Sequence, residues 1–253
     1  MLWDISAING FAIEATDGHL GTVSDVLFSD ADWIVRWLVV DTGKWLPDRK
    51  VLLPVSALGK PAPARRQFPV KLTKQQVQVS PYVVTDQPVS RQVEAYVYDY
   101  YGWDPYWGNG SFNMNAMSTP LVAPILPTST SASAEAHPYE GDPHLRSAAA
   151  ITGYHIHAVD GEIGHVEDFL VDDIGWSVGY LIVDTRNWWP GERVLISPRA
   201  VRRIEWGDRL IYVDVNQKKV KASTRYDPSI ALDRAYTENV LTRYRTHAIA
   251  GWT

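Results

Sequence analysis

The 253-residue chain contains no cysteine. This absence excludes a disulfide scaffold, thiolate-bound zinc or iron–sulfur sites and a cysteine nucleophile. The chain also lacks an apolar run near the ~18 residues that a membrane-spanning helix needs, and its first residues do not form the basic-then-apolar pattern of a signal peptide. We therefore expect a soluble, cytoplasmic protein without membrane insertion.

An excess of positive charge is also missing. The formal net charge is −5, whereas a dedicated nucleic-acid binder needs a basic field for its phosphate contacts. What the chain does have is a hydrophobic fraction of 45%, which is ordinary for a packed globular protein. The composition predicts a globular protein and argues against nucleic acid as a partner.

One internal repeat dominates the sequence. Residues 8–53 align without a gap with residues 151–196, an offset of 143, and 21 of the 46 pairs are identical. Both copies contain Asp-Gly-x-x-Gly-x-Val-x-Asp, then an apolar run ending in Asp-Thr, then Trp-x-Pro. Self-similarity of this extent indicates a duplicated unit.

Residues 104–147 separate the two copies and differ from them in composition. They are rich in proline, glycine and serine, a composition that cannot bury enough apolar surface to offset chain entropy. We therefore divide the chain into a first unit at 1–103, a linker at 104–147 and a second unit at 148–253.

Each copy has the pattern of a small β-structure followed by a helix. Asp17-Gly18 is a strong hairpin signal, and runs of β-branched and aromatic residues of strand length follow. Five or six short strands separated by frequent turns predict a small barrel or sandwich. The helices are predicted from stripes at helical spacing, Val93, Val97 and Tyr101 after Ser90, and Leu232, Tyr236, Val240 and Tyr244 around Asp233.

The order of these motifs resembles the PRC-barrel, the β-barrel shared by the photosynthetic reaction-centre H subunit and a bacterial ribosome-maturation factor. Two copies with trailing helices resemble the double PRC-barrel proteins of bacteria. The resemblance implies a mainly β fold of two tandem PRC-type barrels, each followed by a C-terminal helix and related by a pseudo-twofold axis. Because members of this family work mainly by docking onto other macromolecules, it also implies a docking role.

Tryptophans gather near the predicted loops. Such residues carry a large share of binding energy at protein interfaces, but they could equally pack one barrel against the other. Both interpretations stay open for the candidate interaction surface, which consists of Trp45, Trp188, Trp189, Trp103 and Trp107.

The Asp-Thr pairs raise a hydrolase hypothesis. Asp41-Thr42-Gly43 after an apolar strand resembles an aspartic-protease loop, in which two carboxylates share a proton and activate water. The second copy reads Asp184-Thr185-Arg186 and lacks the permissive glycine. The alternative is that each pair ends a strand and begins a turn through local hydrogen bonds.

A metal hypothesis rests on two histidines. His155 and His157 alternate along a predicted strand and would share one face, with Glu162 or His165 completing a site. The first copy has Ala12 and Glu14 at the two histidine positions, and surface or hydrogen-bonded histidines are the simpler interpretation.

Taken together, the sequence predicts a non-enzymatic protein-interaction module without a cofactor, which docks onto an unidentified protein partner and could form a homodimer. The alternative is a small-ligand or metal-binding protein or hydrolase with a site near His155, His157 and the Asp-Thr turns. A remote alternative, from the resemblance alone, is a ribosome or RNA-assembly factor.

Overall fold

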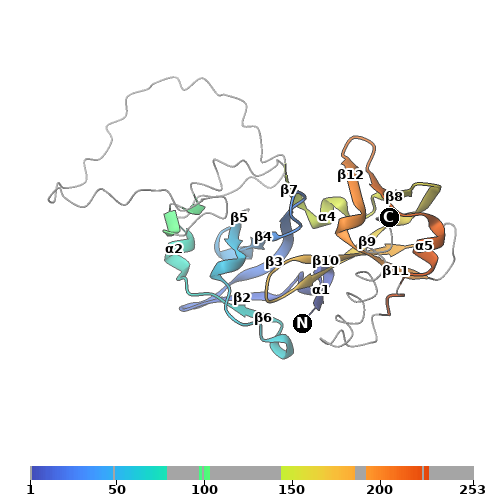
Figure 1. Ribbon diagram of the computed structural model, residues 1–253. Coiled ribbons are helices and arrows are strands. Elements are labelled where there is room, and N and C mark those ends of the chain that lie inside the picture. The colour runs from blue at the N-terminus through green and yellow to red at the C-terminus, as the bar shows by residue number, and fades with distance from the viewer. Residues whose placement is uncertain are drawn as a thin grey trace, which may run out of the picture.

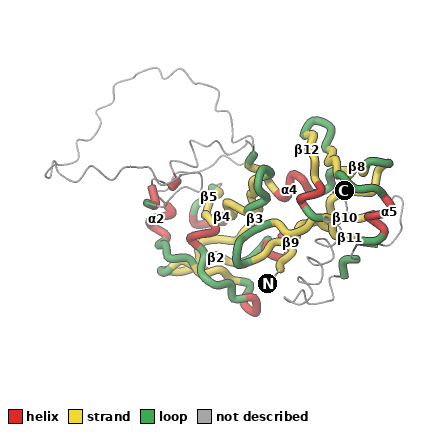
Figure 2. Tube along the Cα trace, viewed as in Figure 1, coloured by secondary structure: helices red, strands yellow, loops and turns green. Residues whose placement is uncertain are grey.

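A computed structural model describes residues 2–47, 49–78, 97–98, 100–102, 144–185, 192–223 and 225–227. The fold is mainly β and has two sheets, one centred on each half of the chain (Figure 1). Strands dominate both halves, and the described helices are short (Figure 2). Among these residues no helix is long and apolar enough to cross a membrane.

The first sheet has the strand order β5-β4-β3-β2-β6. Its neighbours are antiparallel except for β2 and β6, which run parallel. Short helices α1 and α2 flank the sheet in sequence. The elements are α1 (Ile5–Ile8), β2 (Ala12–Ala15), β3 (Gly18–Ser29), β4 (Val35–Asp41), β5 (Lys50–Pro54), β6 (Gln67–Pro69) and α2 (Lys74–Gln78).

The second sheet repeats this arrangement at the offset of 143 residues and adds one edge strand, β12. Its order is β11-β10-β9-β8-β13-β12, with β8 and β13 parallel. The elements are α4 (Ala148–Ile151), β8 (His155–Ala158), β9 (Gly161–Asp172), β10 (Val178–Asp184), β11 (Arg193–Ile196), β12 (Val201–Glu205), β13 (Leu210–Val213) and α5 (Gln217–Lys221).

The two halves exchange their first strands. Strand β1 (Leu2–Asp4) precedes the first sheet in sequence but pairs with β9 of the second. Strand β7 (Leu145–Ser147) precedes the second sheet but pairs with β3 of the first. The registers are equivalent at the repeat offset, since Leu2 faces Asp172 and Leu145 faces Ser29. Each sheet is therefore completed by a strand from the other half.

The aspartate of the repeated Val-x-Asp motif holds this exchange in place. The Asp168 carboxylate accepts a hydrogen bond from the backbone N–H of Ser6 in α1, at 3.2 Å. In the same way the Asp25 carboxylate accepts from the N–H of Ala149 in α4, at 3.2 Å. These N–H groups lie in the first helical turn and have no partner within their own helix. The second half thus caps α1, which follows β1, and the first half caps α4, which follows β7.

The turn between β3 and β4 also contacts the turn between β9 and β10. The backbone N–H of Val35 donates to the carbonyl of Trp176, and the N–H of Val178 donates to the carbonyl of Trp33, both at 2.7 Å. Phe28 and Phe169 meet nearby with ring centres 5.4 Å apart. The contact is reciprocal, with equivalent groups donating in both directions.

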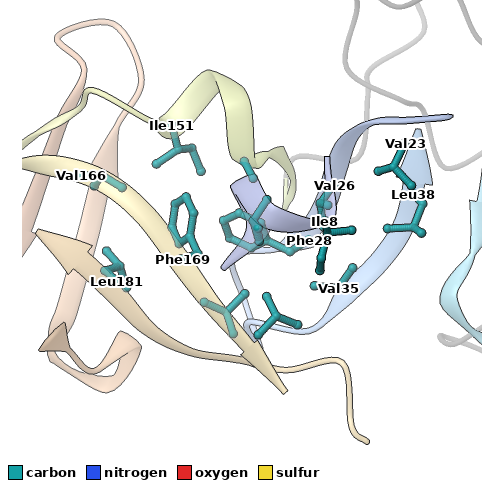
Figure 3. Close-up of a cluster of buried hydrophobic side chains, with 14 of the residues drawn as sticks. Ile8, Val23, Val26, Phe28, Val35, Leu38, Ile151, Val166, Phe169 and Leu181 are labelled. Carbon is teal, nitrogen blue, oxygen red and sulfur yellow. The ribbon is translucent and has the colours of Figure 1, made fainter. Parts of the chain in front are cut away.

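One hydrophobic core runs through both halves. The close-up in Figure 3 shows Ile8, Val26 and Phe28 near Phe169 and Ile151 of the other half. Phe28, Phe169 and Ile151 are fully buried. Because side chains from both repeats bury their surface in the same cluster, the halves stabilise each other through the hydrophobic effect.

The prediction of closed barrels is wrong, because neither sheet closes on itself among the described residues. In the first half, β5 ends at Pro54, and the return toward β6 has only isolated bridges, Leu58 to Val70 and Ala62 to Gln67. Pro61 and Pro63 lie in this return and cannot donate to a ladder of hydrogen bonds. The return segment stays irregular and forms one side of the site described below.

The outer face of each sheet is apolar as well. In the first half, Leu27, Trp37 and Val39 pack against Val97 and Tyr98, which lie in a helical segment. This agrees with the helix predicted after Ser90 along the side of the sheet, of which residues 90–96 lie outside the described part. In the second half the equivalent face contacts Tyr226 and Leu2. The second predicted helix, at 232–244, lies outside the described residues.

A glycine in each half is required by close backbone packing. A Cβ atom at Gly164 would overlap the carbonyl oxygen of Asp184, and Gly21 has the same relation to Asp41. Gly164 also has a φ of +129°, which side chains disfavour. This explains the second glycine of the repeated Asp-Gly-x-x-Gly.

We predict that Gly164→Ala lowers the free energy of unfolding by about 3 kcal/mol, because two backbone segments must separate. The matched control is Gly207→Ala, where nothing lies within 4 Å of the added Cβ; it should change stability by less than about 0.5 kcal/mol. Urea denaturation of both variants measures this. Equal stability of the two variants would contradict the packing argument.

Candidate interaction groove

Asp41 and the threonines of both Asp-Thr pairs bond within their own turns. Asp41 is exposed, and its Oδ1 accepts a hydrogen bond from the N–H of Gly43 at 2.8 Å. The buried Thr42 hydroxyl lies 2.8 Å from the carbonyl oxygens of Leu46 and Arg49. Thr185 is buried and donates to the carbonyl of Glu192 at 2.8 Å. These are the bonds of a strand-to-turn junction, the local alternative to a protease site.

The two histidines lie on one face of β8, as their spacing predicts. His155 is exposed, and its Nδ1 lies 2.8 Å from the Glu162 carboxylate. His157 is half-buried and packs beside Tyr212, with ring centres 5.8 Å apart. In the part of the chain that the structure describes, no group of three or more His, Cys, Asp or Glu side chains is placed to hold a metal ion.

Of the candidate tryptophans, Trp45 is involved in internal contacts. Its Nε1–H donates to the carbonyl of Leu20 at 2.6 Å, and its ring packs against the shared core. The Lys74 ammonium lies 5.6 Å from the ring centre. Trp45 is therefore a packing residue, and the remaining candidates, Trp103, Trp107, Trp188 and Trp189, lie outside the described residues.

Two acidic side chains are held close to the exchanged strand β1. The Tyr226 hydroxyl donates to the Asp4 carboxylate, with 2.7 Å to either oxygen. Burial raises the pKa of Asp4 above its usual value, against the opposing effect of the Tyr226 hydrogen bond. Burial likewise raises the pKa of Asp168, and the bond from Ser6 opposes it. Tyr226, beside Asp4, has its pKa raised by burial and by that contact. At the repeat offset the equivalent of Asp4 is Ser147 on the other exchanged strand, β7, and its hydroxyl donates to the Asp25 carboxylate.

We predict that Asp4→Asn becomes more stable relative to wild type as the pH rises from about 4 to 7. The folded-state pKa of Asp4 is raised, so its ionisation costs more in the folded than in the unfolded chain, and wild-type stability is lost through that range. Asparagine keeps an acceptor for Tyr226 but cannot ionise. Denaturation of both proteins at the two pH values measures the difference.

Asp208→Asn, at an exposed turn residue, is the control for a general loss of negative charge. A stability difference between Asp4→Asn and wild type that stays constant or shrinks with rising pH would contradict this account of the Asp4 environment.

A groove of about 640 Å³ lies where the two halves meet. One wall is the irregular return segment after β5, residues 55–63, and the other is the turn between β9 and β10, residues 173–176. Trp3 of the exchanged strand joins the two walls. The lining is mainly apolar, with Asp173, Lys60 and Ser56 as its polar side chains; the apolar ones are Trp3, Val55, Leu58, Pro61, Pro63, Ile174 and Trp176.

Some groove residues are held in place by contacts with other rings, and one aliphatic side chain at the rim is exposed. Trp3 packs edge-on against Phe11, with ring centres 5.7 Å apart, and its Nε1–H points to the Asp173 carboxylate at 3.3 Å. Trp176 packs against Phe68 at 5.9 Å. Ile174 at the tip of the turn is 73% exposed. Rigid aromatic rings beside an exposed aliphatic residue can bind an apolar side chain from outside.

No motif in the sequence singles out Trp3, Ile174 or Trp176. Trp176 was visible as a repeated residue aligned with Trp33, but nothing local indicated that it faces a groove. Trp3 precedes the aligned repeat, and only the strand exchange brings it to the second half. A signal existed in the difference between copies, since Arg146 stands at the position equivalent to Trp3.

Comparison with known protein families gives a match for the first half of the chain. Residues 4–71 match the PRC-barrel domain family. This match covers α1 and the strands β2 to β6, and it supports a PRC-barrel domain in the first half. A search of curated proteins found no match.

Proposed function

We propose that this protein is a non-enzymatic interaction module built from a duplicated PRC-barrel, and that the groove between its halves docks another protein. The observation that carries the proposal is the apolar, aromatic lining of that groove, with Ile174 73% exposed at its rim. Apolar surface left open beside fixed aromatic rings gains most from burial against a partner.

The duplication supports the proposal because it builds the groove from two halves. Strands and helices recur at the same offset, and the exchanged strands, helix caps and hairpin contacts are reciprocal. We infer that residues 148–253 form a second PRC-type unit, related to the first by a pseudo-twofold axis. Two related units have two similar but non-identical surfaces, and one of these surfaces can bind a partner while the other does not.

The groove favours a protein partner over a small molecule. Its walls are a loop segment and a turn, and Ser56, Lys60 and Asp173 are spread among the apolar groups. An open apolar groove with dispersed polar side chains fits an extended chain, whereas small-ligand sites enclose most of the ligand surface. The partner we propose is therefore a segment of another protein.

The test uses two exposed aliphatic residues as a matched pair. Ile174 is 73% exposed and lines the groove, whereas Val159 is 61% exposed on the turn between β8 and β9 and is not a lining residue. We predict that Ile174→Asp loses a stoichiometric partner in affinity capture from the native lysate, while Val159→Asp keeps it. Quantitative mass spectrometry with isotope-labelled samples compares the amounts of the captured proteins.

Both variants should melt within about 2 °C of wild type, because an exposed substitution away from caps and core changes stability little. A partner retained equally by Ile174→Asp and Val159→Asp, or no partner for the wild-type protein, would contradict groove docking. Loss from both variants would point to a different surface.

A further inference from the structure

Three polar side chains of the groove have donor groups without a partner. The indole N–H of Trp176, the ammonium of Lys60 and the hydroxyl of Ser56 make no hydrogen bond or ion pair to any residue that the structure describes. The other indole of the groove differs, because Trp3 Nε1–H points to the Asp173 carboxylate at 3.3 Å. The lining therefore has open donors, while its carboxylate is already engaged.

Open donors favour a ligand that offers acceptors. The groups of Trp176 and Lys60 can only donate, whereas the Ser56 hydroxyl can donate or accept. A main chain rich in proline fits such a lining, because each proline lacks the backbone N–H but keeps its carbonyl. In the polyproline II conformation these carbonyls make no hydrogen bond within the chain and stay available to a partner.

The aromatic part of the lining suits the same ligand. Aromatic-lined grooves are a recurring docking surface for proline-rich segments. Both tryptophan rings are fixed before binding, since Trp3 packs on Phe11 at 5.7 Å and Trp176 packs on Phe68 at 5.9 Å between ring centres. Rings that are already held and a ligand that is already extended lose little conformational entropy on association.

The backbone of Trp176 also fixes its ring. Its φ is +50°, in the left-handed region that bulky side chains disfavour, and its carbonyl accepts the N–H of Val35 at 2.7 Å. The counterpart Trp33 has a φ of +60° and accepts from Val178 in the same way, but its ring stacks on Phe28. The turn conformation thus belongs to both halves, whereas only the second half's turn presents its tryptophan to the groove.

The charges of the groove favour a carboxylate in the ligand. Lys60 is exposed and has no ion pair in the part of the chain that the structure describes. The other charged lining residue, Asp173, already accepts from Trp3. An acidic residue of a docked segment would therefore find a partner of opposite charge at Lys60.

We propose that the groove binds an extended, proline-rich segment of the partner protein that carries one carboxylate. Its proline rings pack on Trp3 and Trp176, one of its carbonyls accepts the Trp176 Nε1–H, and its carboxylate pairs with Lys60. This inference rests on the proposed docking function and specifies the chemistry of the ligand. The chain's own residues 120–127 contain three prolines but no carboxylate, so we expect another protein as the occupant.

The test begins with selection of a phage-displayed library of random 12-residue peptides on the full chain. We expect wild type to enrich peptides that contain several prolines and an Asp or Glu. Val159→Asp, which alters an exposed residue outside the groove, should enrich the same peptides, and Ile174→Asp should not.

Titration calorimetry with the best synthetic peptide then tests the individual contacts. Trp176→Phe keeps a ring but removes the donor, and it should bind about fivefold more weakly than wild type. Lys60→Gln should bind about threefold more weakly. Lys218→Gln, at an exposed lysine of α5 outside the groove, should bind like wild type.

The outcomes separate this inference from the function it rests on. Enriched peptides without proline, or peptides that bind Trp176→Phe or Lys60→Gln as tightly as wild type, but that lose binding on Ile174→Asp, overturn the proposed ligand and leave groove docking intact. Peptides that bind Ile174→Asp as well as wild type overturn both. Melting temperatures of the variants near that of wild type exclude loss of binding through unfolding.

A further variant, with Pro120, Pro124 and Pro127 replaced by serine, tests the chain's own segment as the occupant. It should enrich the same peptides as wild type. Enrichment on this variant and none on wild type would assign the groove to residues 120–127 and overturn another protein as its occupant. No enrichment on either form would overturn both the ligand and groove docking.

Discussion

The reciprocal pairing of β1 with β9 and of β7 with β3 is the interaction on which the rest of the structure depends. Three residues of strand from each half cross to the other sheet, and the helix that follows each is capped there by Asp168 or Asp25. Buried side chains of both repeats then enter one core. Two units of this size that share strands, caps and core stabilise each other more than two separate small domains could, because a larger fraction of the chain is buried.

The exchange also builds the candidate site. Trp3 lies on β1, which joins the second sheet, and so it stands between the return segment of the first half and the turn at 173–176 of the second. Without the crossing, these three groups would belong to different surfaces. The two copies differ at this place, since Arg146, the counterpart of Trp3, lies over the ring of Trp206, the counterpart of Pro63, whereas Trp3 and Pro63 line the groove.

Much of the fold could be predicted from the sequence because it is local. The offset of 143 recovers the paired elements, Asp17-Gly18 forms the β2–β3 hairpin, and Asp41-Thr42 forms a turn after β4. The exchange could not be predicted, because two similar copies present the same pattern whether a first strand pairs with its own sheet or with the other one. The groove depends on the pairing of β1 with β9, so Trp3 could not be predicted as a lining residue. Trp45 was predicted as an interaction residue because it lies near a loop, but its indole N–H bonds to the carbonyl of Leu20 inside the fold.

The measurement that tests the exchange most directly uses the absence of native cysteine. Leu2 and Asp172 face each other across β1 and β9, so a Leu2→Cys/Asp172→Cys double variant should form a disulfide within one chain on mild oxidation. Leu2→Cys/Ser29→Cys, which tests pairing of β1 with its own half at the equivalent register, should not. Non-reducing electrophoresis and intact mass distinguish the products. A disulfide in the second variant and none in the first, or a disulfide that joins two chains, would contradict the exchange within one molecule.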